Sequence, residues 1–230
     1  MKLFIWTFAC CCLMALASVG QIDAQSAEKH VIIKFAPLAL VDFDNAIQFG
    51  VEVPLGKGIS VQQDLGYGPK GINGWQSTSD NPAEKQTFKS RTNLRYYYLE
   101  RRRMKPYVSA ELLLKRVIYS QNKWVGMECS ERWGPCNYFE NKMIKTRRMV
   151  GAGHAKAGMQ FYFSSRIALD LFAGVGFRSI KVRSMTSLPG NVRVPRNDNW
   201  FENDTPGTNE FIPSLSLGAH IGIILGKFDH

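Results

Sequence analysis

The chain has 230 residues, a net charge of +10 and 45% hydrophobic residues, and its length fits a single domain. No long apolar run follows the N-terminal segment, so a helical membrane protein is excluded, whereas a membrane β-barrel, whose strands are only half apolar, is not. The basic residues are scattered rather than gathered in a stripe, so we expect them on solvated rims and in a polar interior, with no nucleic-acid partner.

The N-terminal segment, residues 1–24, is predicted to be a secretory signal peptide. Lys2 is its short basic region, residues 3–16 form its apolar region, and Ala24 ends a small-residue cleavage site. A lipoprotein signal built on the cysteine run that begins at Cys10 is the alternative, but the apolar stretch before that residue is short for one. We therefore expect the chain to be exported.

The rest of the chain comprises a short polar leader, residues 25–29, and one predicted domain, residues 30–230. Within that domain apolar and polar side chains alternate, and a period of two predicts strands with two unlike faces. In Ile167–Phe177 one face is wholly apolar, and the other carries Asp170 and glycines. The first strand contains Pro37, which predicts a bulge or a local break. We predict eight strands, at residues 30–40, 46–55, 59–68, 88–99, 106–120, 147–163, 167–177 and 211–228.

The connections between the predicted strands alternate in length. Those after the second, fourth and sixth strands are short turns, and those after the third, fifth and seventh are long loops, at residues 69–87, 121–146 and 182–209. Only the first connection, residues 41–45, departs from this rule by being short. Tight periplasmic turns and long outer loops are typical of outer-membrane barrels. The predicted fold is therefore an all-β, eight-stranded antiparallel transmembrane β-barrel with short periplasmic turns and long extracellular loops.

The alternation alone does not say which face points outward, because a soluble ligand-binding barrel would turn its apolar face inward. The polar face is rich in glycine, for example at Gly158, Gly174 and Gly218, and a crowded interior needs such small residues. Aromatic residues lie near the strand ends on the apolar face, as in the girdle of a membrane barrel. Phe228 lies near the end of the last strand. We therefore expect the apolar face to contact lipid.

Short segments of the predicted strands provide the basis for a family resemblance. They are Gly50-Val51-Glu52, Lys105-Pro106-Tyr107-Val108, the Gly174 and Gly176 pair, and Gly218-Ala219-His220-Ile221-Gly222. With the architecture from about His30 onward, they resemble the small outer-membrane barrels of Gram-negative bacteria, the OmpA and OmpX type. The chain is closer still to a domain-of-unknown-function family of such barrels. The resemblance implies an outer-membrane location, contact with lipid and lipopolysaccharide, and insertion by the barrel assembly machinery. It implies no activity.

Charged side chains on the polar face would fill such a barrel, because eight strands leave room only for side chains. An unpaired buried ion is costly, so these charges are expected to pair. The predicted interior network comprises Glu52, Asp64, Arg91, Arg95, Glu111, Lys115, His154, Lys156, Asp170, Arg178 and His220. We expect a salt-bridged plug, with a small gated channel as the alternative.

Two interior histidines, His154 and His220, raise the alternative of a lipid A-modifying membrane enzyme. Ser216 is four residues from His220 on the same strand, or about 13 Å at roughly 3.3 Å per residue, too far for a nucleophile and its base. The sequence alone does not place a serine of another strand beside either histidine. We therefore expect buried, hydrogen-bonded histidines, no enzyme activity and no cofactor.

Two cysteines, Cys129 and Cys136, remain after the signal, and an even pair in an exported chain predicts one disulfide across a short loop. A zinc site would need about four ligands, and none cluster here. The predicted long loops hold four tryptophans, Trp75, Trp124, Trp133 and Trp200. Exposed tryptophans anchor contacts, so we expect either a surface protein or glycan partner, or packing of the loops on one another. The predicted role is structural or adhesive.

Overall fold

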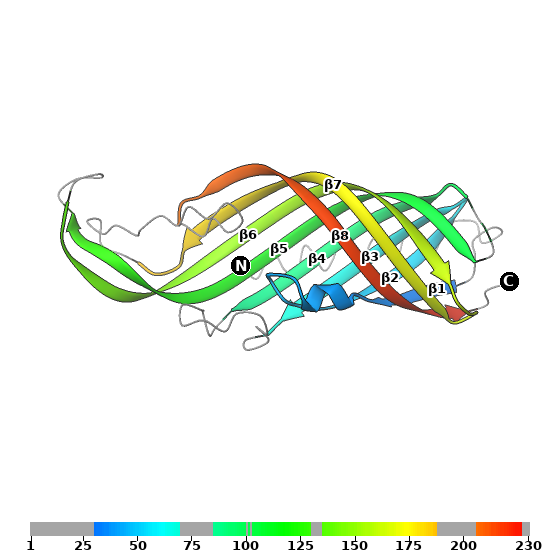
Figure 1. Cartoon of the computed structure of the whole chain (residues 1–230), viewed down its shortest axis with the longest axis horizontal. Helices are drawn as coiled ribbons and strands as arrows, with labels where there is room; N and C mark the ends of the chain where they lie inside the picture. The colour runs from blue at the N-terminus through cyan, green and yellow to red at the C-terminus, as the bar shows by residue number, and fades with distance from the viewer. Residues whose placement is uncertain are drawn as a thin grey trace.

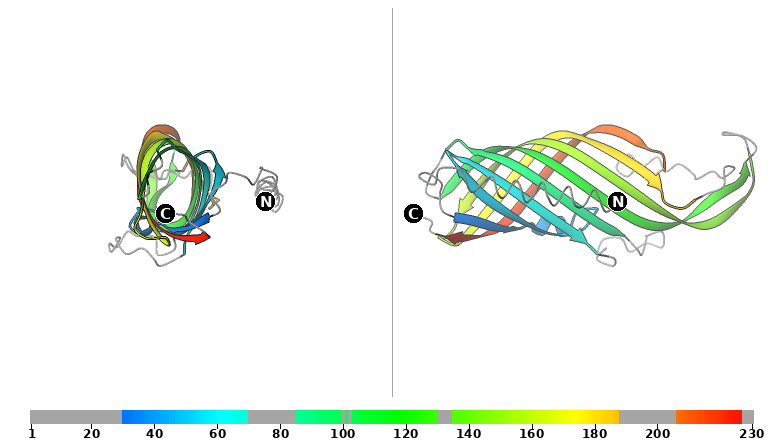
Figure 2. Two further views of the ribbon diagram at one scale, coloured as in Figure 1. Left: turned by 90° about the vertical axis from the view of Figure 1, so that its right-hand side faces the viewer. Right: turned by 180° about the vertical axis from the view of Figure 1, so that it is seen from behind.

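A computed structural model of the protein describes residues 30–69, 85–99, 101, 103–129, 135–187 and 206–226. Eight antiparallel strands pair in chain order, and β1 pairs with β8, so the sheet closes into a barrel (Figures 1 and 2). The strands are β1 (His30–Phe35), β2 (Ile47–Gly56), β3 (Ile59–Gly68), β4 (Gln86–Tyr97), β5 (Met104–Cys129), β6 (Cys136–Tyr162), β7 (Ile167–Ser184) and β8 (Asn209–Gly226). The predicted all-β antiparallel barrel is confirmed. The described residues include no helix long and apolar enough to cross a membrane.

The barrel wall has an apolar outer face and a polar inner face. On β3, Leu65 is 53% exposed and Tyr67 is 54% exposed, whereas Gln62 and Asp64 are almost completely buried. The same alternation continues to β8, where Leu217 is 73% exposed. Soluble proteins mostly bury apolar residues and expose charged ones, so this wall has the opposite arrangement. Many large apolar side chains of the strands therefore point outward, although small apolar clusters, such as Val150, Ile180 and Val182, are buried inside.

Glycines on the inner face make room for large side chains from neighbouring strands. A Cβ atom at Gly158 would lie 2.3 Å from the ring of Tyr107, and one at Gly218 would lie 2.2 Å from the ring of Phe172. Both distances are far shorter than any van der Waals contact, so neither position accepts a larger residue unless the ring moves. The interior is crowded, as the glycine-rich polar face predicts.

The strands β5 and β6 form a long hairpin where the sequence predicted a loop at residues 121–146. Their pairing runs without a gap from Met104↔Phe161 to Met127↔Tyr138 and ends at Cys129↔Cys136, so the hairpin projects well beyond the other strands (Figure 1). The loop prediction was wrong because the hairpin leaves the apolar wall here. A two-stranded ribbon pairs its backbone without needing an apolar band, so its polar composition resembles a loop. The strand β7 also continues past the predicted Phe177, to Ser184.

The first strand is shorter than predicted. It ends at Phe35, and a short 3-10 helix, η2 (Pro37–Leu40), follows it. Proline lacks an N–H and suits the first turn of a helix, so the break expected at Pro37 is confirmed. Because β1 is short, β8 pairs with it only from Ile221 onward. The earlier part of β8 pairs with β7, and η2 lies beside it (Figure 1).

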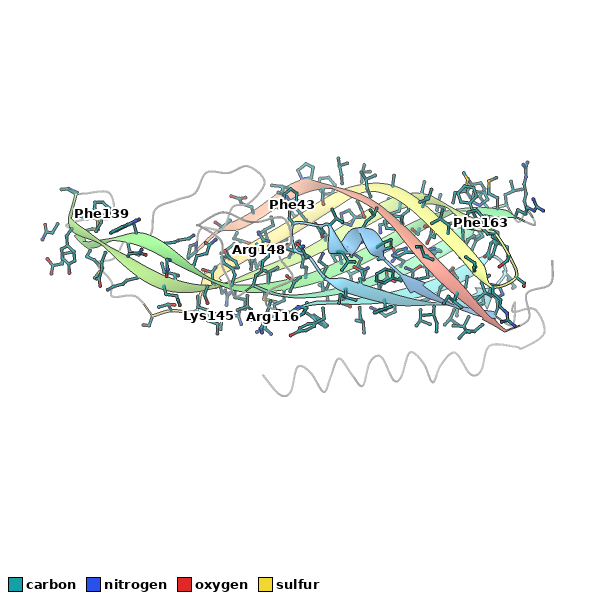
Figure 3. The ribbon with its side chains drawn as sticks, turned by 60° about the horizontal axis from the view of Figure 1, so that its bottom comes forward. Phe43, Arg116, Phe139, Lys145, Arg148 and Phe163 are labelled. Carbon is teal, nitrogen blue, oxygen red and sulfur yellow. A yellow bond between two sulfur atoms is a disulfide. The ribbon has the colours of Figure 1, made fainter. Side chains whose placement is uncertain are left out.

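The two ends of the barrel differ. Phe163 lies at the end that carries the short β6–β7 turn, whereas Phe139 lies on the projecting hairpin at the opposite end (Figure 3). Several predicted features fall outside the described residues, namely the signal peptide at 1–24, the leader at 25–29, most of the first and third long loops, Trp75, Trp133, Trp200 and Phe228.

Candidate functional site

Four buried ions from four strands meet across the middle of the barrel. The Nζ atom of Lys34 lies 2.5 Å from Glu52 and 2.9 Å from Asp170, and Arg95 lies 2.7 Å from Asp170 and 3.4 Å from Glu52. The four side chains are at most 3% exposed. Two cations and two anions cancel, so the group (the central cluster) carries no net charge. Such pairing offsets the cost of burying the ions.

Hydroxyl groups complete the central cluster. Tyr107 donates a hydrogen bond of 2.7 Å to Asp170, and Ser60 donates one of 2.5 Å to Glu52. The guanidinium of Arg95 also lies 4.4 Å from the centre of the Tyr107 ring, which is a favourable cation–π distance. Each carboxylate therefore has partners beyond its salt bridges, and the cluster is cross-linked over most of the barrel circumference.

The ring of His220 lies between two carboxylates beside this cluster. Its Nδ1 atom is 3.5 Å from Asp170 and its Nε2 atom is 3.7 Å from Asp64. Gln62 donates a hydrogen bond of 2.6 Å to the same Asp64. The imidazole also stacks on Phe172, with ring centres 5.2 Å apart. His220 therefore takes part in the interior polar packing.

A second group contains the other interior histidine. The Nδ1 atom of His154 lies 3.1 Å from Oε1 of Glu111, and its Nε2 atom lies 3.1 Å from the hydroxyl of Ser214. Lys156 forms a salt bridge with the other oxygen of Glu111. An acid, an imidazole and a hydroxyl are thus connected in sequence within the barrel. The sequence analysis did not identify Ser214.

Strand register explains how these three residues meet. Glu111 pairs with His154, His154 with Gly176, and Gly176 with Ser214, so they occupy one row across β5, β6, β7 and β8. At Gly176 an added Cβ would lie 1.9 Å from the carbonyl oxygen of Gly153. Only glycine fits here, and its missing side chain lets His154 reach over β7 to Ser214.

A third group lies at the end of the barrel with the long hairpin. Asp44, in the connection after η2, is 2.5 Å from Lys115, 2.7 Å from Arg148 and 2.8 Å from Lys85. Arg148 is labelled in Figure 3. Burial by itself would raise the pKa of the Asp44 carboxyl, but the charges of Lys115, Arg148 and Lys85 outweigh it and hold this pKa well below its usual range. The connection that was predicted to be short is thus anchored by ion pairs.

Eight of the predicted network residues are buried in the interior: Glu52, Asp64, Arg95, Glu111, His154, Lys156, Asp170 and His220. Arg91, Lys115 and Arg178 are half-buried. The predicted residues do not form one network. Lys115, for example, pairs with Asp44, which was not among them. Sequence reasoning left Asp44, Arg148 and Ser214 out, because their roles depend on the cross-strand register.

Two cavities lie on either side of the central cluster. One, of about 340 Å³, is lined by Arg91, His154, Arg178, Ser214 and His220, together with residues of η2. The other, of about 280 Å³, is lined by residues near the β2–β3 turn, including His30, Glu52, Ser60 and Tyr97. No group of three or more metal-ligating side chains occurs within the residues that the structure describes.

The predicted disulfide between Cys129 and Cys136 is present, with an S–S distance of 2.01 Å. It closes the end of the β5–β6 hairpin. Trp124 lies on β5 and not in a loop, which corrects the prediction, although it is 62% exposed. Tyr138 and Phe139 on β6 are also exposed, so the hairpin presents several aromatic side chains.

A closed antiparallel barrel with an apolar exterior and an ion-paired interior defines the class of this protein. Its family follows from comparison with known proteins. The chain belongs to the family described as "Protein of unknown function (DUF3575)", whose profile matches residues 7–203. No curated protein and no solved structure matches the chain.

Proposed function

We propose that the protein is a small outer-membrane β-barrel of the OmpA and OmpX type in a Gram-negative bacterium, with a plugged interior. The single observation that carries this proposal is the exposed apolar face around a closed ring. Exposed large apolar residues such as Leu65, Leu112 and Leu217 would be costly in water, at roughly 25 cal/mol per Å² of apolar surface. The ring closes where β1 pairs with β8, from His30↔Gly226 to Phe35↔Ile221, and hydrocarbon surroundings favour such pairing of backbone groups.

The outer face is also shaped to contact acyl chains. Small residues on the outward side, including Ala110, Ala155, Ala157 and Ala173, lie between larger apolar side chains and form a shallow groove of about 900 Å³. Acyl chains of the membrane would fill such a groove without forming specific contacts. The signal peptide expected from residues 1–24 supports export.

A group of five cations supports lipopolysaccharide as a partner. On the outward side of β5, β6 and β7, directly beyond the apolar face, lie Arg116, Lys145, Arg147, Lys181 and Arg183, which we name the basic belt. Figure 3 labels Arg116 and Lys145. Within the described part of the chain, none of the five lies within 4 Å of a carboxylate. Their positions suit the phosphate groups of lipopolysaccharide, because cations bind phosphate through charge-assisted hydrogen bonds.

The role that follows is structural or adhesive, with contacts to a surface protein or glycan through the projecting hairpin and outer loops. The exposed aromatic residues Trp124, Tyr138 and Phe139 favour such contacts. The small gated channel is less well supported, since the central cluster spans the interior and separates its two cavities. Insertion by the barrel assembly machinery belongs to the same proposal.

Refolding of the mature chain in detergent tests this proposal. We expect the unboiled protein to migrate differently from the boiled protein in an electrophoresis gel and to float with phospholipid vesicles, because a hydrogen-bonded barrel resists unfolding by detergent. The same preparation in a planar bilayer is expected to show no steady conductance. Recovery of the mature chain as a dissolved protein from a periplasmic extract would contradict the proposed location, and steady conductance would contradict the plug.

A further inference from the structure

The arrangement of Glu111, His154 and Ser214 matches the chemistry of a nucleophilic serine. The Nε2 atom of His154 can accept the hydroxyl proton of Ser214 at 3.1 Å, while its Nδ1–H donates to Glu111 at 3.1 Å. Hydrogen-bond reach between nucleophile and base, with the base oriented by a third group, is the geometric signature of such a site. Lys156 holds the second oxygen of Glu111, which favours the ionised carboxylate.

Two of these residues, His154 and Ser214, border a cavity that a substrate can occupy. Both line the cavity of about 340 Å³, and so do Arg91 and Arg178. Within the described part of the chain, neither arginine has a carboxylate within 4 Å. Their positive charges can therefore stabilise an oxyanion that develops near Ser214.

The same cavity reaches the outer surface of the barrel wall. It is lined by Ser214 and Ser216, which face inward on β8, and also by Leu215 and Leu217, which face outward. Both faces of one strand can border a cavity only where it passes around the edge of that strand. Among the described residues, β8 has no strand partner on its β1 side before Ile221.

The helix η2 and Val41, which follows it, border this lateral opening with apolar side chains. Leu38 and Val41 line the cavity and are 53% and 56% exposed. An apolar chain lying against the outer wall would thus meet an apolar entrance that leads to the polar groups around Ser214. Apolar walls with a few convergent polar groups are typical of small-molecule sites.

We propose that Ser214, His154 and Glu111 form an esterase site that hydrolyses a carboxylic ester carrying an apolar acyl chain, which enters between η2 and β8. Entry from lipid rests on the proposed outer-membrane location, whereas the chemistry of the site does not. Ser214 and His154 are the catalytic residues, and Glu111 is a positioning residue.

The reaction has two balanced steps. The Ser214 oxygen bonds to the ester carbonyl carbon as its proton moves to Nε2 of His154. The bond to the alcohol oxygen then breaks, and the alcohol leaves with that proton. In the second step, water gives a proton to His154, and the oxygen of that water bonds to the acyl carbon. The bond to Ser214 breaks, the fatty acid leaves, and the serine regains its proton.

The test uses the full mature chain, refolded in detergent micelles, with a fluorophosphonate and with p-nitrophenyl butyrate and palmitate. We expect the fluorophosphonate to label Ser214, as identified by peptide mass. Ser214→Ala should abolish the labelling and lower kcat/KM for ester hydrolysis by at least about 10³-fold. Ser109→Ala is the matched control, because Ser109 lies on β5 and is not among the described residues that line this cavity, and it should stay within about twofold of the wild type.

His154→Gln should also abolish labelling while gel migration of the unboiled protein remains that of a folded barrel. A folded wild-type barrel that is not labelled at Ser214, or that hydrolyses esters no faster than Ser214→Ala, would overturn the esterase site and leave the outer-membrane proposal intact. Labelling of Ser214 in a chain that does not associate with vesicles would instead support the site and overturn the proposed location. Preference for the palmitate over the butyrate ester would support the apolar entrance, and the reverse preference would overturn it.

Discussion

Single residues decide how the interior of this barrel is filled. Gly158 accommodates the ring of Tyr107, whose hydroxyl then reaches Asp170. Gly176 has a similar effect for His154, which can extend toward Ser214 because no side chain stands between them. At these inner glycines the missing side chain thus leaves space, and a functional group of a neighbouring strand can extend over that position.

Replacement of Asp170 by asparagine is expected to destabilise the barrel by about 3–5 kcal/mol, because Lys34 and Arg95 would keep their buried charges and lose a shared anion. Unfolding by urea in detergent micelles measures this change. Glu140→Gln is the matched control, since Glu140 forms an exposed pair with Lys142 at 3.0 Å and should change stability by less than about 1 kcal/mol. Equal effects of the two substitutions would contradict the structural importance of the central cluster.

At the scale of elements, the connection after η2 is held in place by charge. Asp44 is buried among Lys115 of β5, Arg148 of β6 and Lys85, which directly precedes β4. Since η2 borders the lateral opening beside β8, these ion pairs also fix one side of the entrance to the cavity that contains Ser214.

The lowered pKa of Asp44 predicts a dependence of stability on pH. A carboxyl whose pKa is lower in the folded state stabilises the fold above its unfolded-state pKa, about 3.9, and loses this contribution as the pH falls through the folded-state pKa. The thermal midpoint of the wild type should therefore exceed that of Asp44→Asn at pH 7, and the difference should shrink below about pH 4. Asp42→Asn, which removes one partner of Lys89 at a more exposed position, should have a smaller effect. A difference independent of pH would show that the ion pairs are not responsible.

Sequence periodicity was sufficient to predict most of the wall strands, because outward and inward residues differ in polarity at every second position. It failed at the β5–β6 hairpin, where Trp124 and its neighbours lie on a ribbon that needs no apolar face. It also could not pair His154 with Ser214. That contact depends on the relative register of β6, β7 and β8, and residue spacing within one strand does not encode the register of the next.

At the scale of the whole molecule, the charges on the outside define an orientation. The apolar face is followed by the basic belt and then by the β5–β6 hairpin, all at the end opposite the short turns. In the proposed membrane location, this spatial order places the cations at the level of lipid phosphates, with the disulfide-closed hairpin beyond them.

A double substitution of the basic belt, Arg147→Gln with Arg183→Gln, is expected to weaken lipopolysaccharide binding about tenfold or more, since two charge-assisted contacts would be lost. Arg147 and Arg183 are directly paired between β6 and β7. Binding of purified lipopolysaccharide to the refolded protein in detergent measures the change. The control, Arg166→Gln, removes an exposed cation at the end with the short turns and should leave binding within about twofold. Equal binding by the double variant and the wild type would contradict the proposed partner.

The barrel wall closes only when β1 pairs with β8, so the fold needs every strand. Strands at the two ends of the described chain supply the last set of backbone hydrogen bonds, from His30↔Gly226 to Phe35↔Ile221. A polypeptide halted after β7 would leave one side of β1 and one side of β7 with bare N–H and C=O groups, each costing several kcal/mol in hydrocarbon. The seven remaining strands would not close into a smaller barrel. Partial synthesis should therefore yield no inserted protein at all, and insertion must wait until the final strand has been delivered.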